Sequence, residues 1–302
     1  MEPVRQQVEK LLAGQRGEQV GHTLTSVFTL CAHAHRRTAA LALAAAQHDA
    51  AHPSAAQAAV LLYVETARDH LRAIALDWPQ RQPSATPDAQ AMAWLRDCPL
   101  PLASAKTIVD ADSAWQSLAG LRTWLEQSVL QQPVGDWLGA YRAPQALAEW
   151  CSAQAARLAP ARCLANWHAA ASALAPETRL LALLDADPAR QATQLRQLAQ
   201  ALVNDPDFVQ HPSWRGQCAE NGPWARLRHR SMQASMRHTA WTRLTARWLE
   251  LLELAAATPE ADRAGAAPLL SSGALKLADG QALAWCEMAR GLLLHWVQLD
   301  GD

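Results

Sequence analysis

The feature that most constrains the fold is a long alanine- and leucine-rich stretch that prolines divide into segments. Residues 91–174 are of a helix-forming kind and are interrupted at Pro99, Pro101, Pro133, Pro144 and Pro160. Proline interrupts a helix because it lacks an amide hydrogen and its ring clashes with the preceding turn. The stretch therefore predicts several helices in succession. Because the interruptions are irregularly spaced, a solenoid of equal repeats is excluded.

The composition of the whole chain also favours helix over sheet. Ala, Leu, Gln and Arg dominate, whereas strand-forming aromatic residues are scarce, with 2 Tyr and 2 Phe among 302 residues. Hydrophobic residues make up 50% of the chain, so it can bury a sizeable core. The length fits one large domain or two. A surface loop is predicted at about residues 79–90, which hold three prolines and no apolar periodicity.

Charge and targeting patterns exclude several classes of function. The 27 basic and 28 acidic residues give a net charge of −1, which is not the electrostatic footprint of a protein that binds nucleic acid or an anionic membrane. No secretory signal is found, and no uncharged run approaches the ~18 residues of a membrane span. None of the six cysteines forms a CxxC pair. We therefore expect a cytoplasmic protein with reduced thiols, no membrane insertion and no nucleic-acid partner.

The stretch at residues 285–300 combines charged residues with an apolar run. Glu287, Arg290 and Gly291 precede apolar residues that lead to His295. One interpretation is an amphipathic helix or strand with a solvated arginine. The other is a buried guanidinium, which needs an anionic partner because an unpaired buried charge is very unfavourable.

A second candidate site lies near residue 31. Cys31 and His35 are four residues apart, so on a helix they share one face. Thiolate and imidazole are both good ligands for iron, nickel or zinc, although two ligands do not close a metal site. The alternative is a small buried cysteine beside a hydrogen-bonded histidine.

Charged residues also crowd the helix that we predict at about residues 55–75. Glu65, Asp69 and His70 lie within six positions of one another. They form either a solvated, salt-bridged face of the helix or a polar site into which His70 and one carboxylate point.

One long helix is predicted at about residues 224–256, after a loop rich in glycine and proline. It carries six arginines, which Glu250 and Glu253 follow. The acidic residues and the balanced charge of the chain argue against a nucleic-acid-binding helix. Residues 274–278 are expected to form a short strand or a turn.

Four stretches, taken together, resemble motifs of the large subunit of nickel–iron hydrogenases. The first motif of that family has the form Arg-x-Cys-Gly-x-Cys-x-x-Ala-His. Residues 26–35 match its second cysteine with Cys31 and its histidine with His35. Ser26 and Phe28 replace the arginine and the first cysteine of the motif.

The other three stretches follow in the same order as in that family. Residues 69–78 resemble an Asp-His-Leu helix with a following Leu-Asp-Trp. Residues 214–226 resemble the loop Tyr-x-Gly-x-x-x-Glu-x-Gly-Pro-Leu-Ala-Arg, with Trp in place of the Tyr and the Leu. Residues 287–295 resemble Glu-Ala-Pro-Arg-Gly-x-Leu-x-His, with Ala289 in place of the proline.

Most metal ligands of the hydrogenase family are missing from this chain. The large subunits hold nickel and iron with two CxxC pairs, of which only Cys31 is matched here, so we expect no nickel site. The pattern is similar to the HupK/HoxV family of hydrogenase-maturation proteins, which look like ligand-poor copies of the large subunit. Its members are expected to continue beyond the position that matches Asp302. The resemblance implies a maturation factor and not an enzyme.

The resemblance also implies a role with the iron–dicyanide–carbonyl unit, which the family assembles or passes on before nickel is inserted. Cys31, as a thiolate, is the candidate transient iron ligand. His35 would orient the ligand shell, and Arg290 would donate hydrogen bonds to the cyanides. The other expected cofactor-binding residues lie in the matched stretches: Glu287, Glu220 and His70. A second thiolate from Cys218 or Cys286 stays open.

Composition and resemblance together predict a mainly α fold. The expectation is a large helical bundle resembling a reduced hydrogenase large subunit, with at most a few short strands and with residues 1–302 in a single domain. The expected partners are a HypC-like small maturation chaperone and the hydrogenase large-subunit precursor. The alternative function is a docking protein that mimics the large subunit to recruit maturation factors without metal. An enzyme lacks support, because the sequence shows no nucleophile–base pair, phosphate loop or closed metal motif.

Overall fold

The computed structural model describes residues 4–47, 55–81, 89–100, 110–176, 178–180, 187–231 and 237–300. The chain divides into two compact units. Unit 1 comprises Met1–Leu62, Glu177–Ala225 and Leu270–Asp302, and unit 2 comprises Tyr63–Pro176 and Arg226–Leu269. The chain passes between the units four times, and two of these crossings lie within helices α4 and α11. The expectation of a single domain stays a prediction.

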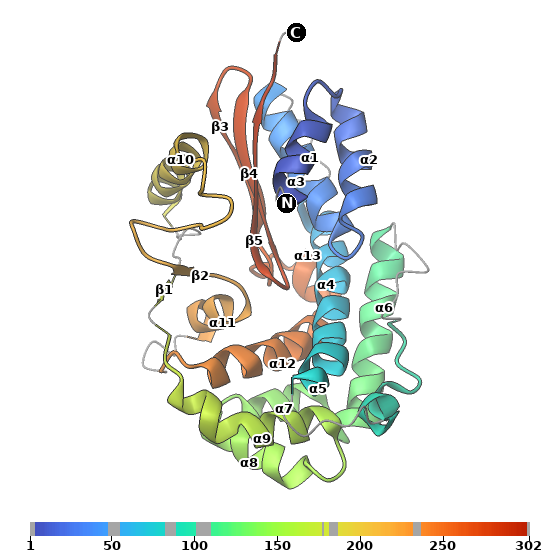
Figure 1. Ribbon diagram of the computed structural model, residues 1–302. Coiled ribbons are helices and arrows are strands. Elements are labelled where there is room, and N and C mark those ends of the chain that lie inside the picture. Colours follow the sequence, from blue (N-terminus) through green and yellow to red (C-terminus); the bar gives the residue numbers. More distant parts are fainter. Residues whose placement is uncertain are drawn as a thin grey trace. The chain divides into compact units, whose positions relative to one another are not determined.

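Unit 1 is built around a three-stranded antiparallel sheet, with α10 on one side and α1 to α3 on the other (Figure 1). Its helices are α1 (Val4–Leu12), α2 (Gly17–Val27), α3 (Ala32–Gln47), the first part of α4 (Ala55–Arg72), α10 (Pro188–Asn204) and the start of α11 (Pro223–Ser231). The strands of the sheet, in spatial order, are β3 (Ser272–Ala278), β4 (Gln281–Met288) and β5 (Gly291–Gln298). A separate parallel pair is formed by β1 (Arg179–Leu180) and β2 (Ala219–Glu220).

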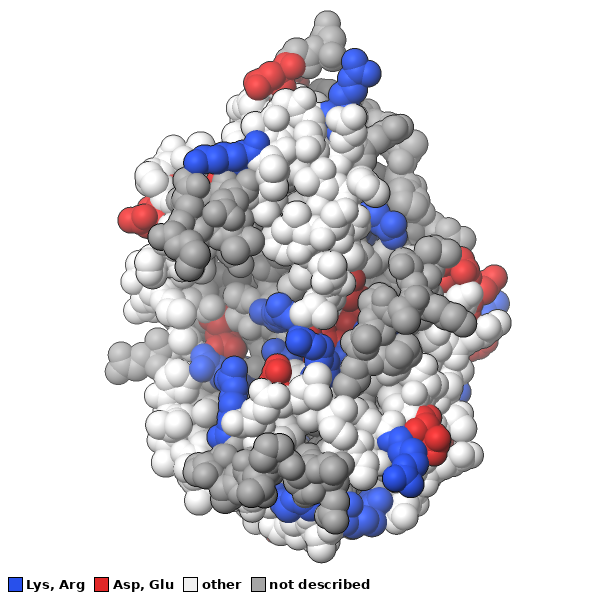
Figure 2. Space-filling model, turned by 45° about the vertical axis from the view of Figure 1, so that its right-hand side comes forward, with Lys and Arg blue, Asp and Glu red and all other residues white. Residues whose placement is uncertain are grey.

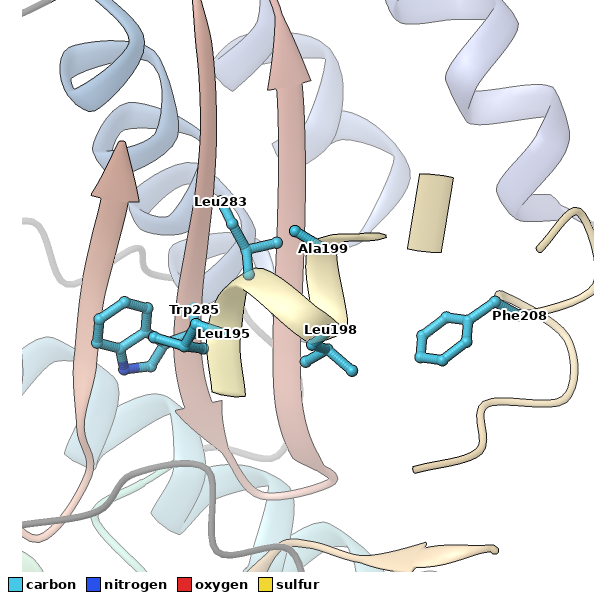
Figure 3. Close-up of a cluster of buried hydrophobic side chains, with 6 residues drawn as sticks. All are labelled: Leu195, Leu198, Ala199, Phe208, Leu283 and Trp285. Carbon is cyan, nitrogen blue, oxygen red and sulfur yellow. The ribbon is translucent and has the colours of Figure 1, made fainter. Parts of the chain in front are cut away.

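The two faces of the sheet differ in the residues they carry. Successive side chains of a strand point to opposite faces, so Leu283 and Trp285 of β4 share one face. They pack with Leu195, Leu198 and Ala199 of α10 and with Phe208 in a cluster of buried apolar side chains (Figure 3). The opposite face of β4 presents small residues such as Ala282 and Ala284, which are completely buried. Alanines on α3 also lie buried, so helix and sheet pack closely on this side.

Unit 2 is helical throughout its described part. Its elements are the rest of α4, α5 (Trp78–Gln80), a 3₁₀ turn (Ala89–Leu95), α6 (Ala111–Trp124), α7 (Val134–Tyr141), α8 (Pro144–Gln154), α9 (Ala159–Ala173), the rest of α11, α12 (Ala240–Ala256) and α13 (Pro259–Arg263). Two π-helical segments, Ala73–Asp77 and Leu125–Leu130, continue α4 and α6. Pro144 and Pro160 lie in the first turns of α8 and α9, where a missing amide hydrogen does no harm.

Tryptophans form the core of unit 2. The rings of Trp137 and Trp150 meet edge to face with centroids 5.0 Å apart, and Trp248 lies 6.0 Å from Trp150. Trp137 and Trp248 are completely buried. These residues tie α7 and α8 to α12, because large rings bury much apolar area at a single position. The sequence interpretation of the tryptophans as packing anchors agrees with this cluster.

The prediction of a helical bundle with at most a few short strands is wrong. Helices do dominate, but unit 1 is organised around a sheet whose strands are seven or eight residues long. These strands are rich in Ala and Leu, which favour helices on intrinsic propensity, and tertiary packing overrides that preference. The stretch predicted as a short strand or turn at residues 274–278 belongs to β3.

The long helix predicted at residues 224–256 is also divided. α11 ends at Ser231, and a new helix, α12, begins after Thr239. The Thr239 side chain accepts from the backbone of Thr242, whose own side chain accepts from the Thr239 backbone. This capping box satisfies amide groups that a helix start leaves without partners. Most of the predicted loop at residues 79–90 lies outside the described residues.

The surface carries both signs of charge. On the face drawn in Figure 2, basic and acidic side chains occur near one another between broad uncharged areas. None of the helices in the described part of the chain is both long enough and apolar enough to cross a lipid bilayer.

Candidate functional site

The polar residues of the candidate site in unit 1 lie on the face of the sheet that α3 covers. Residues paired across antiparallel strands point to the same face, and the register pairs Ser272 with Cys286. His295 is paired with Ala284, two residues from Cys286, so it shares this face as well. Arg37 of α3 reaches it too, because its Nε donates a hydrogen bond to Ser272 Oγ at 2.9 Å.

His35 meets His295 at this contact between α3 and β5. Nδ1 of His35 lies 3.2 Å from Nε2 of His295, so one ring donates an N–H and the other accepts it. The ring of Phe28 stacks on the ring of His35, with centroids 3.9 Å apart and planes only 3° from parallel. Burial, and then the neighbouring His35, lower the pKa of His295 to about 3. The ring of His295 is therefore neutral at neutral pH.

Cys31 lies immediately before α3 and is half-buried. Its carbonyl accepts from the backbone amide of His35 at 3.1 Å, so the two residues are one helical turn apart. The helical spacing inferred from the sequence is thus present in the structure. Cys31 joins Phe28 and His35 at the same end of α3.

Arg290 occupies the two-residue turn between β4 and β5, beside Ala289. Its side chain is exposed. Of the two interpretations of this stretch, the structure agrees with the one that places this arginine at the surface. The guanidinium of Arg290 is therefore not the buried one that the second interpretation requires.

The loop at residues 214–226 contacts the turn between β4 and β5. Asn221 Oδ1 accepts from the backbone amide of Leu292 at 2.8 Å. A Cβ on Gly222 would lie 3.4 Å from the Cα of Gly291, and a Cβ on Gly291 would overlap the Asn221 side chain. Both glycines also have positive φ, at 102° and 122°, which L-residues rarely adopt. Two of the four hydrogenase-like stretches therefore meet directly, and both require glycine.

The two predicted glutamates of unit 1 have different surroundings. Glu287 and Ser271 exchange hydrogen bonds: Glu287 Oε2 accepts from the Ser271 amide, and the Glu287 amide donates to the Ser271 carbonyl, both at 2.8 Å. Glu287 thereby anchors the chain just before β3. Glu220 is half-buried in the short strand β2. Of the two candidate second thiolates, Cys218 is exposed and Cys286 is buried.

His70 lies in unit 2, in a buried ionic cluster. Its Nε2 is 2.8 Å from Glu250 Oε2, and Arg226 donates from Nε and Nη2 to the two oxygens of that carboxylate at 2.7 Å each. Arg247 Nη1 lies 3.3 Å from His70 Nδ1. His70 and Glu250 are completely buried. The polar site considered for this helix therefore exists, but its carboxylate comes from α12 and not from Glu65 or Asp69.

The neighbours of His70 fix its protonation. A carboxylate accepts at Nε2 and a guanidinium donates at Nδ1, so the ring is the neutral tautomer with its proton on Nε2. Burial is the main cause that lowers the pKa of His70, and Glu250 opposes it. Burial alone would raise the pKa of Glu250, but the charge and hydrogen bonds of Arg226 hold it well below its ordinary value. Glu250 is therefore ionised and bound bidentately, which is the strongest geometry for this pair.

Several residues of these sites were not predicted as site residues, among them Arg37, Glu250 and His295. His295 is the last residue of the fourth matched stretch, but no role was predicted for it. Glu250 lies between leucines in the apolar run at residues 248–252, a context that signals burial. Arg37 precedes a run of alanines on α3, which also signals a buried face.

The metal-binding capacity of the described residues is limited. Among the residues described, no group of three or more His, Cys, Asp or Glu side chains is placed to hold a metal ion. Cys31, His35 and His295 therefore do not make up such a group in the described chain.

Comparison with known proteins agrees with the four matched stretches. Over 97% of its length, the chain is 38% identical to the hydrogenase expression/formation protein HoxV of Cupriavidus necator, and the match covers 74% of that relative. The chain therefore belongs to the class of hydrogenase expression/formation proteins. Within that class, it belongs to the HupK/HoxV family of hydrogenase-maturation proteins, which confirms the resemblance inferred from the sequence. No protein-family profile matches the chain, and no solved structure matches it.

Proposed function

We propose that the protein is a nickel–iron hydrogenase maturation factor that holds the iron–dicyanide–carbonyl unit as cargo and passes it to the large-subunit precursor. Membership of the HupK/HoxV family supports the general role. The observation that carries the specific role is the contact between the first and fourth matched stretches, where His35 meets His295 one turn from Cys31. The third stretch joins the fourth through Asn221 and Leu292.

The proposed chemistry needs one thiolate, from Cys31, and one neighbouring imidazole, from His35, whose orientation is fixed. Cys31 would be the transient protein ligand of iron, because a thiolate suits a soft, carbonyl-bearing metal centre. His35 would hydrogen-bond the ligand shell, and the neutral ring of His295 would hold His35 in its orientation. A single thiolate leaves the other positions of the iron to the ligands that it carries and to a partner protein. Such a site releases its cargo more readily than a closed one.

Two partner proteins would take part in the transfer of the iron unit. A HypC-like small chaperone would deliver the iron unit, and the hydrogenase large-subunit precursor would receive it. The protein would act in the cytoplasm as an accessory factor without catalytic turnover of its own.

The test of the proposal is infrared spectroscopy and iron analysis on protein purified after co-expression with the maturation partners. The wild-type protein should carry iron together with cyanide and carbonyl stretching bands. Cys31→Ala should lose both. The matched control is Cys98→Ala, since Cys98 is also a half-buried free thiol but lies in unit 2, and it should keep both signals.

The alternative function is a docking protein that recruits maturation factors without metal. Two apolar side chains beside Cys31 favour it, because Val27 and Leu30 keep 39% and 41% of their surface exposed. Exposed apolar residues that lie close together in the chain are compatible with a protein contact. Under this alternative, Cys31→Ala keeps the association with the large-subunit precursor, and Val27→Asp with Leu30→Asp abolishes it.

A further inference from the structure

Arg37 is a buried cation whose charge is not balanced by a carboxylate. Its side chain keeps 9% of its surface exposed. Within the described part of the chain, its hydrogen bond is the one from Nε to Ser272 Oγ, and no Asp or Glu forms an ion pair with it. The ionisable side chain that acts on its charge is Cys286, a completely buried thiol on the adjacent strand.

A largely buried guanidinium without a carboxylate beside it is less favourable than a paired one. It has five N–H donors, of which the Ser272 contact uses one, and it stays charged at any physiological pH. Burial lowers the pKa of Arg37 and Cys286 raises it again. The other buried arginine of the described chain, Arg226, is bound bidentately by Glu250. The same protein thus provides a carboxylate for one buried guanidinium and not for the other.

We infer that Arg37 and Ser272 form a binding site for a small, singly charged anion between α3 and the sheet. The Ser272 hydroxyl accepts from Arg37 and so keeps its own proton for an anion. The neighbouring side chains on this face are the Cys286 thiol and the His295 ring, and neither is a carboxylate that would compete for the guanidinium. The site must be small, because α3 packs closely on the alanines of β4.

The chemistry that fits is a compact acceptor such as a pseudohalide, either free or bound to a metal. The second source deepens the proposed function and rests on it: the cyanides of the iron unit are anionic acceptors of this kind. Arg37 lies two residues after His35 on α3, whereas Arg290, the arginine first considered for this role, is exposed in a turn. Arg37 would therefore be the guanidinium that recognises an anionic ligand, with Cys286 beside it.

The first experiment titrates the purified protein with sodium thiocyanate, with sodium chloride at equal ionic strength as the reference. The C≡N stretching band of bound thiocyanate and the calorimetric affinity are measured. Arg37→Gln should weaken binding by about tenfold or more, the effect of losing one charge-assisted hydrogen bond. Arg36→Gln is the matched control, since Arg36 is the exposed neighbour on the same helix, and it should bind as wild type does. Equal affinity of wild type and Arg37→Gln would overturn the inference.

Two further measurements cover the case in which Arg37→Gln does not fold and distinguish the two sources of the anion. If Arg37→Gln fails to fold by circular dichroism, Arg37→Lys and Ser272→Ala replace it, and unchanged affinity in both overturns the inference. On protein co-expressed with the maturation partners, a shift of the cyanide bands in Arg37→Gln supports the metal-bound source. If wild-type protein shows no cyanide bands at all, the proposed function fails, while the thiocyanate titration still decides whether the anion site exists.

Discussion

His35 Nδ1 lies 3.2 Å from His295 Nε2, and this contact joins residues that are 260 positions apart in the chain. It ties the first turn of α3 to the middle of β5 in unit 1. Phe28 also contacts His35, by stacking on its ring. The imidazole of His35 therefore contacts both an aromatic ring and a neutral histidine, one helical turn from Cys31.

The neutral state of His295 predicts that stability falls in weak acid. Its pKa in the folded protein is about 3, below the ordinary value of 6.5, so the unfolded chain binds a proton that the folded protein excludes. The stabilisation is present above pH 6.5 and is lost as the pH falls toward 3. The expected loss at about pH 5 is on the order of 2 kcal/mol, measured as the change in urea unfolding free energy from about pH 7.

The variant His295→Asn separates the contribution of His295 to the pH dependence of stability from the contributions of the other ionisable groups. Its unfolding free energy should depend less on pH than that of the wild type. Part of the dependence will remain, because burial lowers the pKa of His70 in the same direction. His22→Asn, which removes an exposed histidine, should keep the wild-type dependence. Identical slopes for wild type and His295→Asn would contradict the assignment.

Gly291→Ala should destabilise the turn between β4 and β5. Its φ of 122° is unfavourable for alanine, and the new Cβ would overlap the Asn221 side chain. We expect a loss of about 2–4 kcal/mol in unfolding free energy, the combined effect of backbone strain and steric overlap. Gly139→Ala is the control, because Gly139 lies in α7 with no atom within 4 Å of the added carbon. That variant should be as stable as the wild type or more so, and a similar loss in both would sink the explanation.

Glu250→Gln should be among the most damaging single changes in unit 2. It leaves the buried charge of Arg226 without its bidentate carboxylate, and breaking a buried ion pair in this way costs about 3–5 kcal/mol. Denaturant unfolding measures the change. Glu260→Gln removes an exposed pair with Arg263 and should have no measurable effect. A tolerated Glu250→Gln would show that the cluster with His70 is not needed for stability.

The helices were predictable because local sequence determines them. Alanine and leucine favour helix, and Pro144 and Pro160 mark the starts of α8 and α9. The sheet was missed because β4 and β5 are built from the same residue types. A local signal was nevertheless present: Asp279 and Gly280 form the two-residue turn between β3 and β4, and Asp-Gly is a strong hairpin signal.

The candidate site was only partly predictable, since its contacts join distant segments. The spacing of Cys31 and His35 fixed their relative position on α3, because four residues make about one helical turn. Nothing local to His35 indicates His295 as its neighbour. The same limit applies to the carboxylate of Glu250, which reaches His70 from a helix 180 residues away, and to the burial of Arg37, which depends on the sheet.

The measurement that tests the central claim most directly is the infrared spectrum of the protein purified after co-expression with the maturation partners. The cargo role predicts cyanide and carbonyl bands with bound iron in the wild type and in Cys98→Ala, and their loss in Cys31→Ala. Wild-type protein without these bands and without iron, or a Cys31→Ala variant that keeps them, would contradict the role of Cys31 as the cargo ligand.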